Sequence, residues 1–471
     1  MNTGKLREWR GGGFHAQVGL LALAIFVSCW APRAASAGEL ELSTDKSGLK
    51  TDLIPDRPLT FELFNPYFGK GPITSFTLPG GAVWQPTLLV YGNLRTALQS
   101  FDNGAPNANT SEWANRLDLD INLGLSGTER FNIGFRPLDE EGVFTGWNFS
   151  DDEWIDGTDG EPNRFFFEGD FGELFPNLDP NDSRSLDYGF AIGRQPINFQ
   201  DGILINDTLD AIGVTRNTLI PGGTSNLRVT ALYAWNEIHT RDRSRGRNRE
   251  DKDAHLFGLF TEADTPWSTV AFDTALVIDE GSKNGDGIVV GVSGVQRIGQ
   301  INTTFRWNTS MPTAGGSPTM RAGNLIFAEV STTPHGAHNL VYANAFVGID
   351  RFSSAARDPA VGGPLGRTGI LFAAVGLGRY GAALGNDADR SVGAAIGYQM
   401  FFQGNRRQLI VELGGRGRTS ESIPPNAAVA LGARFQQAIA QNFIALVEGF
   451  VGDREGVNGI GGIRAEVQVK F

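Results

Sequence analysis

The sequence predicts an all-β protein, a transmembrane antiparallel β-barrel of 16 or 18 strands with long outer loops and short periplasmic turns. Three observations lead to this fold class. Apolar and polar residues alternate with a period of two through most of the chain, and helical periodicity is hard to find. The third observation is the length of the alternating runs. Soluble sheets favour strands of about five or six residues, whereas a tilted strand that crosses a bilayer needs about nine to eleven, a length that several of these runs reach.

Residues 1–37 are expected to be a signal peptide. Lys5, Arg7 and Arg10 form a basic start, and Val18–Trp30 is an apolar run too short to span a bilayer as a helix. The small residues at Ala35–Ala37 have the character of a cleavage site. The chain is therefore expected to be exported and cut before residue 38.

The one cysteine of the sequence, Cys29, lies within this signal segment. A lipoprotein, in which Cys29 would carry the lipid, is therefore an alternative interpretation. The bulky residues Phe26 and Trp30 fit a lipidation site poorly. After cleavage the chain would have no cysteine, which excludes disulfides, thiolate metal sites and cysteine catalysis.

The composition of the rest of the chain argues against nucleic acid as a partner. Removal of the signal peptide leaves 36 basic and 51 acidic residues, a net charge of −15. Glycine is frequent, with 62 residues in the whole chain, which suits many short turns. No apolar stretch after Trp30 approaches the length of a membrane helix.

Residues 38–82 lack clean alternation and are expected to form an N-terminal segment that either lies on the periplasmic side or plugs the near end of the barrel. The barrel itself is expected over residues 83–471. An even number of strands is the rule for single-chain bacterial barrels, so 16 or 18 is expected. The strands are predicted to start near Trp84, Trp113, Glu129, Arg164, Leu186, Leu227, His255, Trp267, Gly287, Ile301, Arg321, Leu340, Thr368, Arg390, Arg407, Ala427, Asn442 and Ile460.

The alternation also predicts which side chains face the lumen. Within residues 116–125 the leucines and Ile121 share one face, and Asp118 and Asp120 share the other. A barrel of this size leaves an aqueous channel, so the polar face should line it. The pore-lining candidates chosen by this parity are Arg95, Asp118, Asp120, Arg228, Arg306, Glu412, Arg416, Arg418, Arg464 and Glu466.

The stretch from Leu186 to Leu219 is the most individual part of the sequence. Its Gly193, Arg194 and Gln195 precede a proline that cannot donate to a sheet ladder, and Asp201, Asp207 and Asp210 follow. This passage resembles the corresponding one of porin-type outer-membrane proteins, including the alginate-export-like and related porin families. The resemblance implies that Arg194 and Gln195 face the lumen, and that Asp207 and Asp210 lie on an inward-folded segment or on the neighbouring strand. Arg194 and Asp207 therefore join the pore-lining candidates.

Two charged loops have alternative interpretations. Residues 241–253 contain six cations and four anions, and they form either a basic loop folded into the channel or a solvated hairpin, which we favour. Residues 139–161 contain nine acids, whose oxygens could bind calcium. Because no register matches the twelve-residue calcium loop, an unliganded outer loop is the preferred interpretation.

Enzymatic motifs are absent or weak in this sequence. After the signal peptide the histidines are His239, His255, His335 and His338, with no HExxH pattern. A lipase- or deacylase-type barrel enzyme remains an alternative, since one histidine and one serine could meet across strands. No cofactor and no metal site are expected.

The last nine residues, Ile463–Phe471, alternate without a break between apolar and polar side chains. In a closed barrel this strand would pair on both sides and lose its free edge. Phe471 is similar to the C-terminal aromatic residue by which the barrel-assembly machinery recognises outer-membrane barrels. The resemblance also implies that the protein can be a homotrimer in the outer membrane.

These observations predict a porin-like channel in the bacterial outer membrane for passive diffusion of small polar solutes or oligosaccharides. Both charge signs occur among the pore-lining candidates, so no strong single-ion selectivity is expected. A structural or adhesive surface protein is the other alternative, and a lumen filled by side chains or by residues 38–82 would favour it.

Overall fold

The computed structural model describes residues 75–105, 108–242, 247–279, 285–313, 319–419, 426–439, 442–457 and 459–471. The expected signal peptide and most of the expected N-terminal segment lie outside these residues. Residues 75–86 form a small hairpin, in which β1 (Phe76–Thr77) pairs with β2 (Val83–Trp84), ahead of the first long strand. That strand starts at Thr87, a few residues later than predicted.

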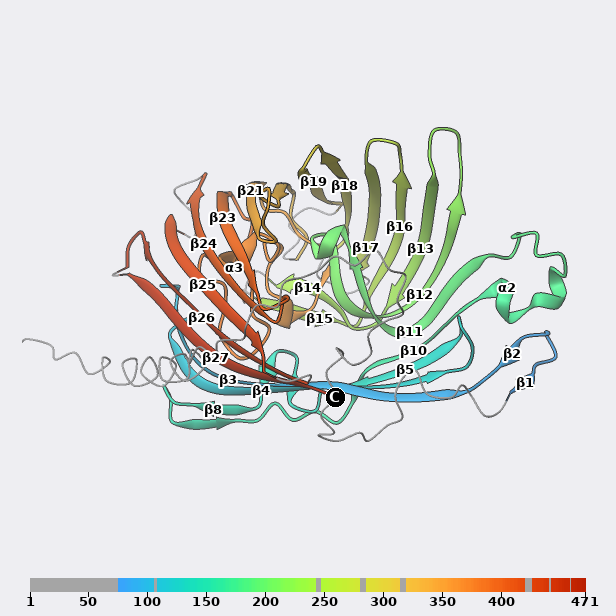
Figure 1. Ribbon diagram of the computed structural model, residues 1–471, viewed down its shortest axis with the longest axis horizontal. Helices are drawn as coiled ribbons and strands as arrows, with labels where there is room; N and C mark the ends of the chain where they lie inside the picture. Colours follow the sequence, from blue (N-terminus) through green and yellow to red (C-terminus); the bar gives the residue numbers. More distant parts are fainter. Residues whose placement is uncertain are drawn as a thin grey trace, which may run out of the picture.

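Across the described ranges, 18 antiparallel strands form one closed barrel (Figure 1), as the sequence predicted. The last strand pairs with the first, with Gln468 opposite Arg95, so the sheet closes on itself. The barrel strands are β3 (Thr87–Asp102), β4 (Thr110–Gly124), β5 (Arg130–Phe135), β10 (Pro162–Asp170), β11 (Tyr188–Phe199), β12 (Ile205–Leu219), β13 (Asn226–Trp235), β16 (Ala254–Asp264), β17 (Thr269–Asp279), β18 (Gly287–Ile298), β19 (Ile301–Pro312), β20 (Gly323–Thr332), β21 (Leu340–Asp350), β23 (Ser391–Phe402), β24 (Arg407–Arg418), β25 (Ala428–Ala438), β26 (Phe443–Arg454) and β27 (Ile460–Lys470).

Two strand predictions were wrong and cancelled each other in the count. No strand starts near Thr368, because the apolar run there folds as the short helix α3 (Gly369–Phe372) inside the barrel. Conversely, β12 was missed, since the acids and asparagines of residues 205–219 hide its alternation. Asp207 and Asp210 thus lie on the strand next to β11, one of the two places expected for them.

The two ends of the barrel differ in their connections. At one end, which we call the short-turn end, successive strands are joined by turns such as residues 299–300, and both the start of β3 and the end of β27 lie there. The other end, the long-loop end, carries longer connections that contain most of the remaining elements. These are β6 (Asp139–Glu140), β7 (Val143–Phe144), β8 (Gly146–Asn148), β9 (Glu153–Ile155), η3 (Gln200–Gly202), β14 (Ile238–Asp242), β15 (Arg247–Asp251), β22 (Ala356–Arg357), η4 (Pro359–Val361) and α3. The connection from β10 to β11, with α2 (Phe171–Leu174) and η2 (Pro176–Leu178), is the longest at the short-turn end.

The wall has an apolar outer face and a mixed inner face. Leu259, Phe272 and Val411 point outward and are exposed, whereas Phe327 and Phe346 point inward and are buried. Inward apolar side chains are buried because segments of the chain fold into the lumen and pack against them. Among the described residues, no helix is long and apolar enough to cross a membrane.

Candidate functional site

The connection between β21 and β23 folds into the barrel and defines the main feature of the lumen. We call residues 351–390 the inward segment. Its two ends meet, because the Arg390 backbone N–H donates to the Asp350 carbonyl at 2.8 Å. Between these ends Leu365, Phe372 and Leu384 are fully buried, and α3 lies inside the ring of strands (Figure 1). The segment therefore occupies part of the lumen that the wall alone would leave open.

Glu412 of β24 fixes the helical part of the inward segment. Its carboxylate accepts hydrogen bonds from the backbone N–H groups of Ile370 and Leu371, both at 2.9 Å, and from the hydroxyl of Tyr342. A carboxylate at the start of a helical turn satisfies N–H groups that have no partner within the helix. Gly369 passes this carboxylate with a φ of +68°, and a side chain there would collide with it. Glu412 is completely buried as a result.

Arginines of the wall hold the carbonyl groups of the same segment. Arg416 donates to the carbonyls of Leu384, Gly385 and Asp387 at 2.9, 3.0 and 2.9 Å. Arg454 donates to the carbonyl of Ala383 at 3.2 Å. Hydrogen bonds from charged donors are stronger than neutral ones, so the wall fixes the course of the segment.

Further along the same wall, beyond β27, β3 and β4 hold the segment in the same way. Arg95 and Arg116 both donate to the carbonyl of Gly376, at 3.4 and 3.1 Å. Gln99 donates to the carbonyl of Leu377 at 3.0 Å. The inward segment is thus bound to a continuous arc of the wall that runs from β24 to β4.

A second inward feature is the connection between β11 and β12, which we call the inward tip (residues 199–204). Gln200 reaches β17, where its amide donates to Asp273 at 2.7 Å, and Asp201 forms ion pairs with Arg306 and Arg367. Gln200 and Asp201 have φ values of 53° and 52°, a left-handed conformation that non-glycine residues seldom adopt. The tip therefore bends sharply inward and crosses to the wall of β17–β19.

The tip and the inward segment are joined to each other. Ile205 and Ala356 pair as neighbouring parallel strands of β12 and β22. Arg357 donates to the carbonyl of Gly202, and the Ser354 hydroxyl donates to the carbonyl of Ile203 at 2.6 Å. Together the two features form a partition across the lumen, which we regard as the candidate functional site.

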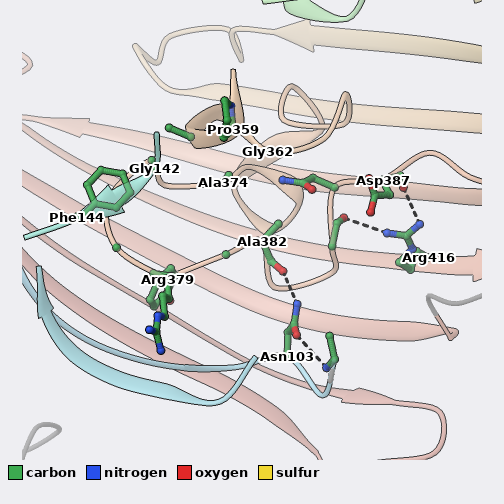
Figure 2. Close-up of a pocket in the computed structure, with 18 of the residues that line it drawn as sticks. Asn103, Gly142, Phe144, Pro359, Gly362, Ala374, Arg379, Ala382, Asp387 and Arg416 are labelled. Carbon is green, nitrogen blue, oxygen red and sulfur yellow. Dashed lines mark hydrogen bonds between the residues drawn. The ribbon is translucent and has the colours of Figure 1, made fainter. Parts of the chain in front are cut away.

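The partition borders a cavity of about 460 Å³ at its long-loop side (Figure 2). Arg379, Arg416 and Arg454 line the cavity, and Asp387 is the carboxylate among its lining residues. Arg454 is 5% exposed and has no ion pair among the described residues. Glycines and alanines of the inward segment form much of the remaining lining, so much of the cavity wall consists of small side chains. The three arginines and one carboxylate give the lining a net positive charge.

An unbroken chain of ion pairs runs along the inner wall from β25 to β3. Glu448 contacts both Arg434 and Arg464, the latter at 2.9 Å. Glu466 contacts Arg464 and, at 2.8 Å, Arg95. Because each carboxylate is shared by two guanidinium groups, the chain orders four neighbouring strands of the wall.

A second cluster follows on β4, β5 and β10. Asp118 contacts Arg116 and Arg136 at 3.0 and 3.2 Å, and Arg136 also contacts Asp358 of the inward segment at 3.4 Å. Asp120 contacts Arg164 at 3.1 Å. This cluster connects the wall to the partition.

Eleven of the twelve sequence-predicted site residues lie on the inner wall, and ten of these eleven belong to one of the arrangements above or lie at a barrel end. Arg228 pairs with Glu262 toward the short-turn end, at 3.1 Å, and Arg418 pairs with Glu455 at the long-loop rim, at 3.1 Å. The eight others with a place described above are Arg95, Asp118, Asp120, Arg306, Glu412, Arg416, Arg464 and Glu466.

Arg194 does not face the lumen, contrary to the prediction. It lies on the outer side of β11, in register with Phe165, which is exposed, and it forms ion pairs with Asp210 and Glu237. Gly193 adopts a φ of +119° immediately before it, while Gln195 points inward and is buried. The period of two therefore places Arg194 and Gln195 on opposite faces, a conflict within the prediction itself.

Asp207 is on the inner side of β12, where it is 3% exposed and bonded to His239. The described part of residues 241–253 does belong to a hairpin, as expected, but this hairpin lies inside the barrel against the inward segment and not in outer solvent (Figure 1). β14 contacts β22 of the inward segment, and Arg241 forms an ion pair with Asp387 at 3.0 Å.

Several charged residues of the inner wall and of the partition were not predicted from the sequence. Arg434 and Glu448 follow the same parity as Arg464 and could have been found by it. Arg357, Arg367 and Arg379 lie on the inward segment, whose course no periodicity indicates. Long-range contacts, rather than local pattern, place these three side chains.

The acidic residues 139–161 and the histidines show no catalytic or metal-binding arrangement in the part of the chain that the structure describes. No group of three or more potential metal ligands occurs there. The His239 ring bonds to Asp207, and the His255 ring lies 3.1 Å from the Tyr233 hydroxyl. Neither of these two histidines is thus paired with a serine.

Comparison with known proteins supports the fold. No family model matches the sequence, and no curated protein matches it. The fold is similar to a BenF-like porin from Pseudomonas fluorescens Pf-5, with 10% identity over 82% of this chain and 98% of that one and a TM-score of 0.52. OccAB4 of Acinetobacter baumannii gives 10% identity over 84% and 100% of the two chains and a TM-score of 0.52.

A further similar structure is Pseudomonas aeruginosa OccK2 (OpdF) in complex with glucuronate, with 10% identity, 82% and 98% coverage and a TM-score of 0.50. At this level of identity the similarity establishes the barrel fold and no more. None of these three is described as an alginate-export protein, so the finer resemblance of residues 186–219 to that group stays a hypothesis.

Proposed function

We propose that the protein is a porin-like channel of the bacterial outer membrane through which small polar solutes diffuse passively. The observation that carries this proposal is a closed barrel with an apolar outer face, a charged inner wall and a partition that narrows the lumen. Barrels of this size leave an aqueous interior, and charged side chains in it select by size and charge. A structurally similar protein that is described as a BenF-like porin supports the same function.

The outer face and the N-terminal sequence support the outer membrane as the location. Exposed apolar side chains cover the outer wall. Trp113 and Trp154 pack edge to face on it, with 6.3 Å between their ring centroids. Tryptophan is favoured where a barrel meets the membrane interface. An export signal at residues 1–37 is consistent with this location. Recognition of Phe471 by the assembly machinery and a trimeric state are further hypotheses.

The cavity beside the partition favours acidic solutes, which makes a small sugar acid a suitable candidate. Arg454 is buried without an opposing carboxylate among the described residues. Arg379 lines the same cavity, is half exposed and lies 3.8 Å from the Asp151 carboxylate. A buried cation is costly unless an anion or hydrogen bonds compensate it. The similar structure that holds glucuronate contains an anionic sugar of this kind.

Conductance of the purified protein in a planar bilayer tests the proposed function. We expect stable single-channel currents in a simple salt, together with release of small sugars from protein-containing liposomes. A correctly folded barrel that gives no current and no solute release in any condition would contradict the channel and favour the structural alternative, in which the partition seals the lumen.

Removal of positive charge from the cavity is expected to weaken anion passage. Arg379→Gln and Arg454→Gln should each shift the reversal potential in a salt gradient toward cation preference and should reduce the rate of glucuronate entry into liposomes. Arg297→Gln, an exposed arginine at the short-turn end far from the cavity, is the matched control and should change neither quantity. An equal shift in all three variants would show that the cavity has no special role.

A further inference from the structure

The β14–β15 hairpin is an outer connection that lies within the lumen and contacts the partition. Figure 1 shows both strands in the interior of the ring. Ile238 at its start is fully buried in the same apolar cluster as Leu204 and Ala356. β14 contacts β22, and β15 contacts η4. The hairpin therefore covers the part of the inward segment that carries Arg357 and Asp358.

One buried pair ties this hairpin to the wall. The carboxylate of Asp207 accepts a hydrogen bond from the backbone N–H of His239 at 2.9 Å and lies 2.8 Å from the ring Nδ1. The backbone N–H of Thr208 also donates to it, at 2.8 Å. His239 and Asp207 are 8% and 3% exposed. Both the main chain and the side chain of His239 are thus held at one buried point on β12.

A second contact ties the hairpin to the partition. Arg241 lies two residues after His239 and forms an ion pair with Asp387 at 3.0 Å. Asp387 lines the cavity, and its carbonyl is held by Arg416 at 2.9 Å. Movement of the hairpin would therefore act on the inward segment as well as on the space above it.

We propose that the β14–β15 hairpin is a pH-sensitive latch, in which the contact between His239 and Asp207 holds the hairpin over the partition at acidic pH and releases it as the pH rises. This inference rests on the proposed channel function. The His239 ring is the one titratable group of this contact whose ordinary range lies near neutral pH. A docked hairpin narrows the lumen, so the latched state is the less conductive one.

Several charged groups act on the His239 ring. Asp207 faces it from β12 and Asp358 from the inward segment, Arg194 acts on it from the outer side of β11, and Arg357 lies close to Asp207. Burial alone would lower the pKa of His239, but its hydrogen bond to Asp207 and the negative charges of Asp207 and Asp358 outweigh burial and Arg194. The pKa of His239 is therefore raised above its ordinary value.

The direction of the pH effect follows from this shift. A histidine with a raised pKa in the docked state stabilises that state fully below its ordinary pKa of about 6.5. The stabilisation is lost as the pH rises through the higher pKa of the docked form. The latch should thus hold at acidic pH and weaken under alkaline conditions.

Single-channel recording of the full-length protein between pH 5 and pH 9 tests the latch. We expect the conducting state to become less populated on acidification, with a midpoint above about pH 6.5. His239→Gln keeps a polar side chain that cannot become charged, and it should remove this transition. His255→Gln is the matched control, since the His255 ring contacts Tyr233 outside the lumen, and it should keep the transition.

The possible results of this recording test the channel and the latch separately. Absence of current at every pH contradicts the channel, whereas current that does not change between pH 5 and pH 9 overturns the latch alone. A transition that survives in His239→Gln with an unchanged midpoint also overturns the latch. A shift of heat-modifiable electrophoretic mobility, measured for each variant, confirms that the barrel has folded, so that loss of the transition cannot be attributed to misfolding.

Discussion

Val467→Arg is expected to prevent most of the chain from assembling into a barrel. Val467 lies on the outer face of β27, where it is 40% exposed and has Ala445 and Thr96 as its neighbours across the sheet. In the proposed outer-membrane setting this position contacts hydrocarbon. A cation near the middle of a membrane costs about 2 to 4 kcal/mol on the lipid face of a barrel. That cost is a large part of the stability of a typical folded domain.

Gln468→Arg is the control for this prediction, since it adds the same charge one residue later. Gln468 points to the inner face, where its amide donates to Glu466 at 2.6 Å, so the new cation would meet a carboxylate and water. The yield of heat-modifiable barrel in the outer-membrane fraction measures both effects. Similar yields for the two variants would mean that the faces of β27 are assigned incorrectly.

The strands of the wall could be predicted because the same alternation of outward and inward side chains repeats along each of them. Each strand has an outer and an inner face, so the residues near Asp118, Glu412 and Arg464 show a period of two that needs no knowledge of distant parts. The predicted closure of the last strand on the first is confirmed for the same reason. In a closed barrel every strand is hydrogen-bonded to a neighbour on each side, so a chain with this alternation has few alternative folds.

The partition could not be predicted, because no periodicity encodes it. Residues 369–372 are apolar, as a strand might be, but their backbone N–H groups bond to Glu412, more than forty residues further along the chain, instead of to a neighbouring strand. The inward tip depends on the pair between Asp201 and Arg306, which is equally remote in sequence. Sequence parity found Glu412 and Arg306 as inward residues but could not show that they hold other segments of the chain.

This difference also changes the interpretation of the inner arginines. From the sequence, Arg95 and Arg416 were expected to line open water, whereas the structure has both bonded to carbonyl groups of the inward segment. The side chains that are more open at the partition are Arg367 and Arg379, which no alternation could indicate.

Deletion of residues 352–389 is expected to increase the single-channel conductance at least about two-fold, because conductance rises with the free cross-section of the lumen. The ends of the segment already meet through the hydrogen bond between Arg390 and Asp350, so a linker of a few glycine and serine residues should close the gap without moving β21 or β23. The strands of the wall are paired to one another independently of the segment. The barrel should therefore still form, with some loss of stability where Phe346 becomes exposed to water.

Glu412→Ala provides a graded test of the same idea. It removes the carboxylate that holds Ile370 and Leu371 but leaves the carbonyl contacts of Arg416 and Arg454 in place. We expect noisier currents and a smaller rise in conductance than in the deletion variant. If the deletion variant forms a heat-modifiable barrel whose conductance equals that of the unaltered protein, the inward segment is not the constriction, and the path must be limited elsewhere along the inner wall.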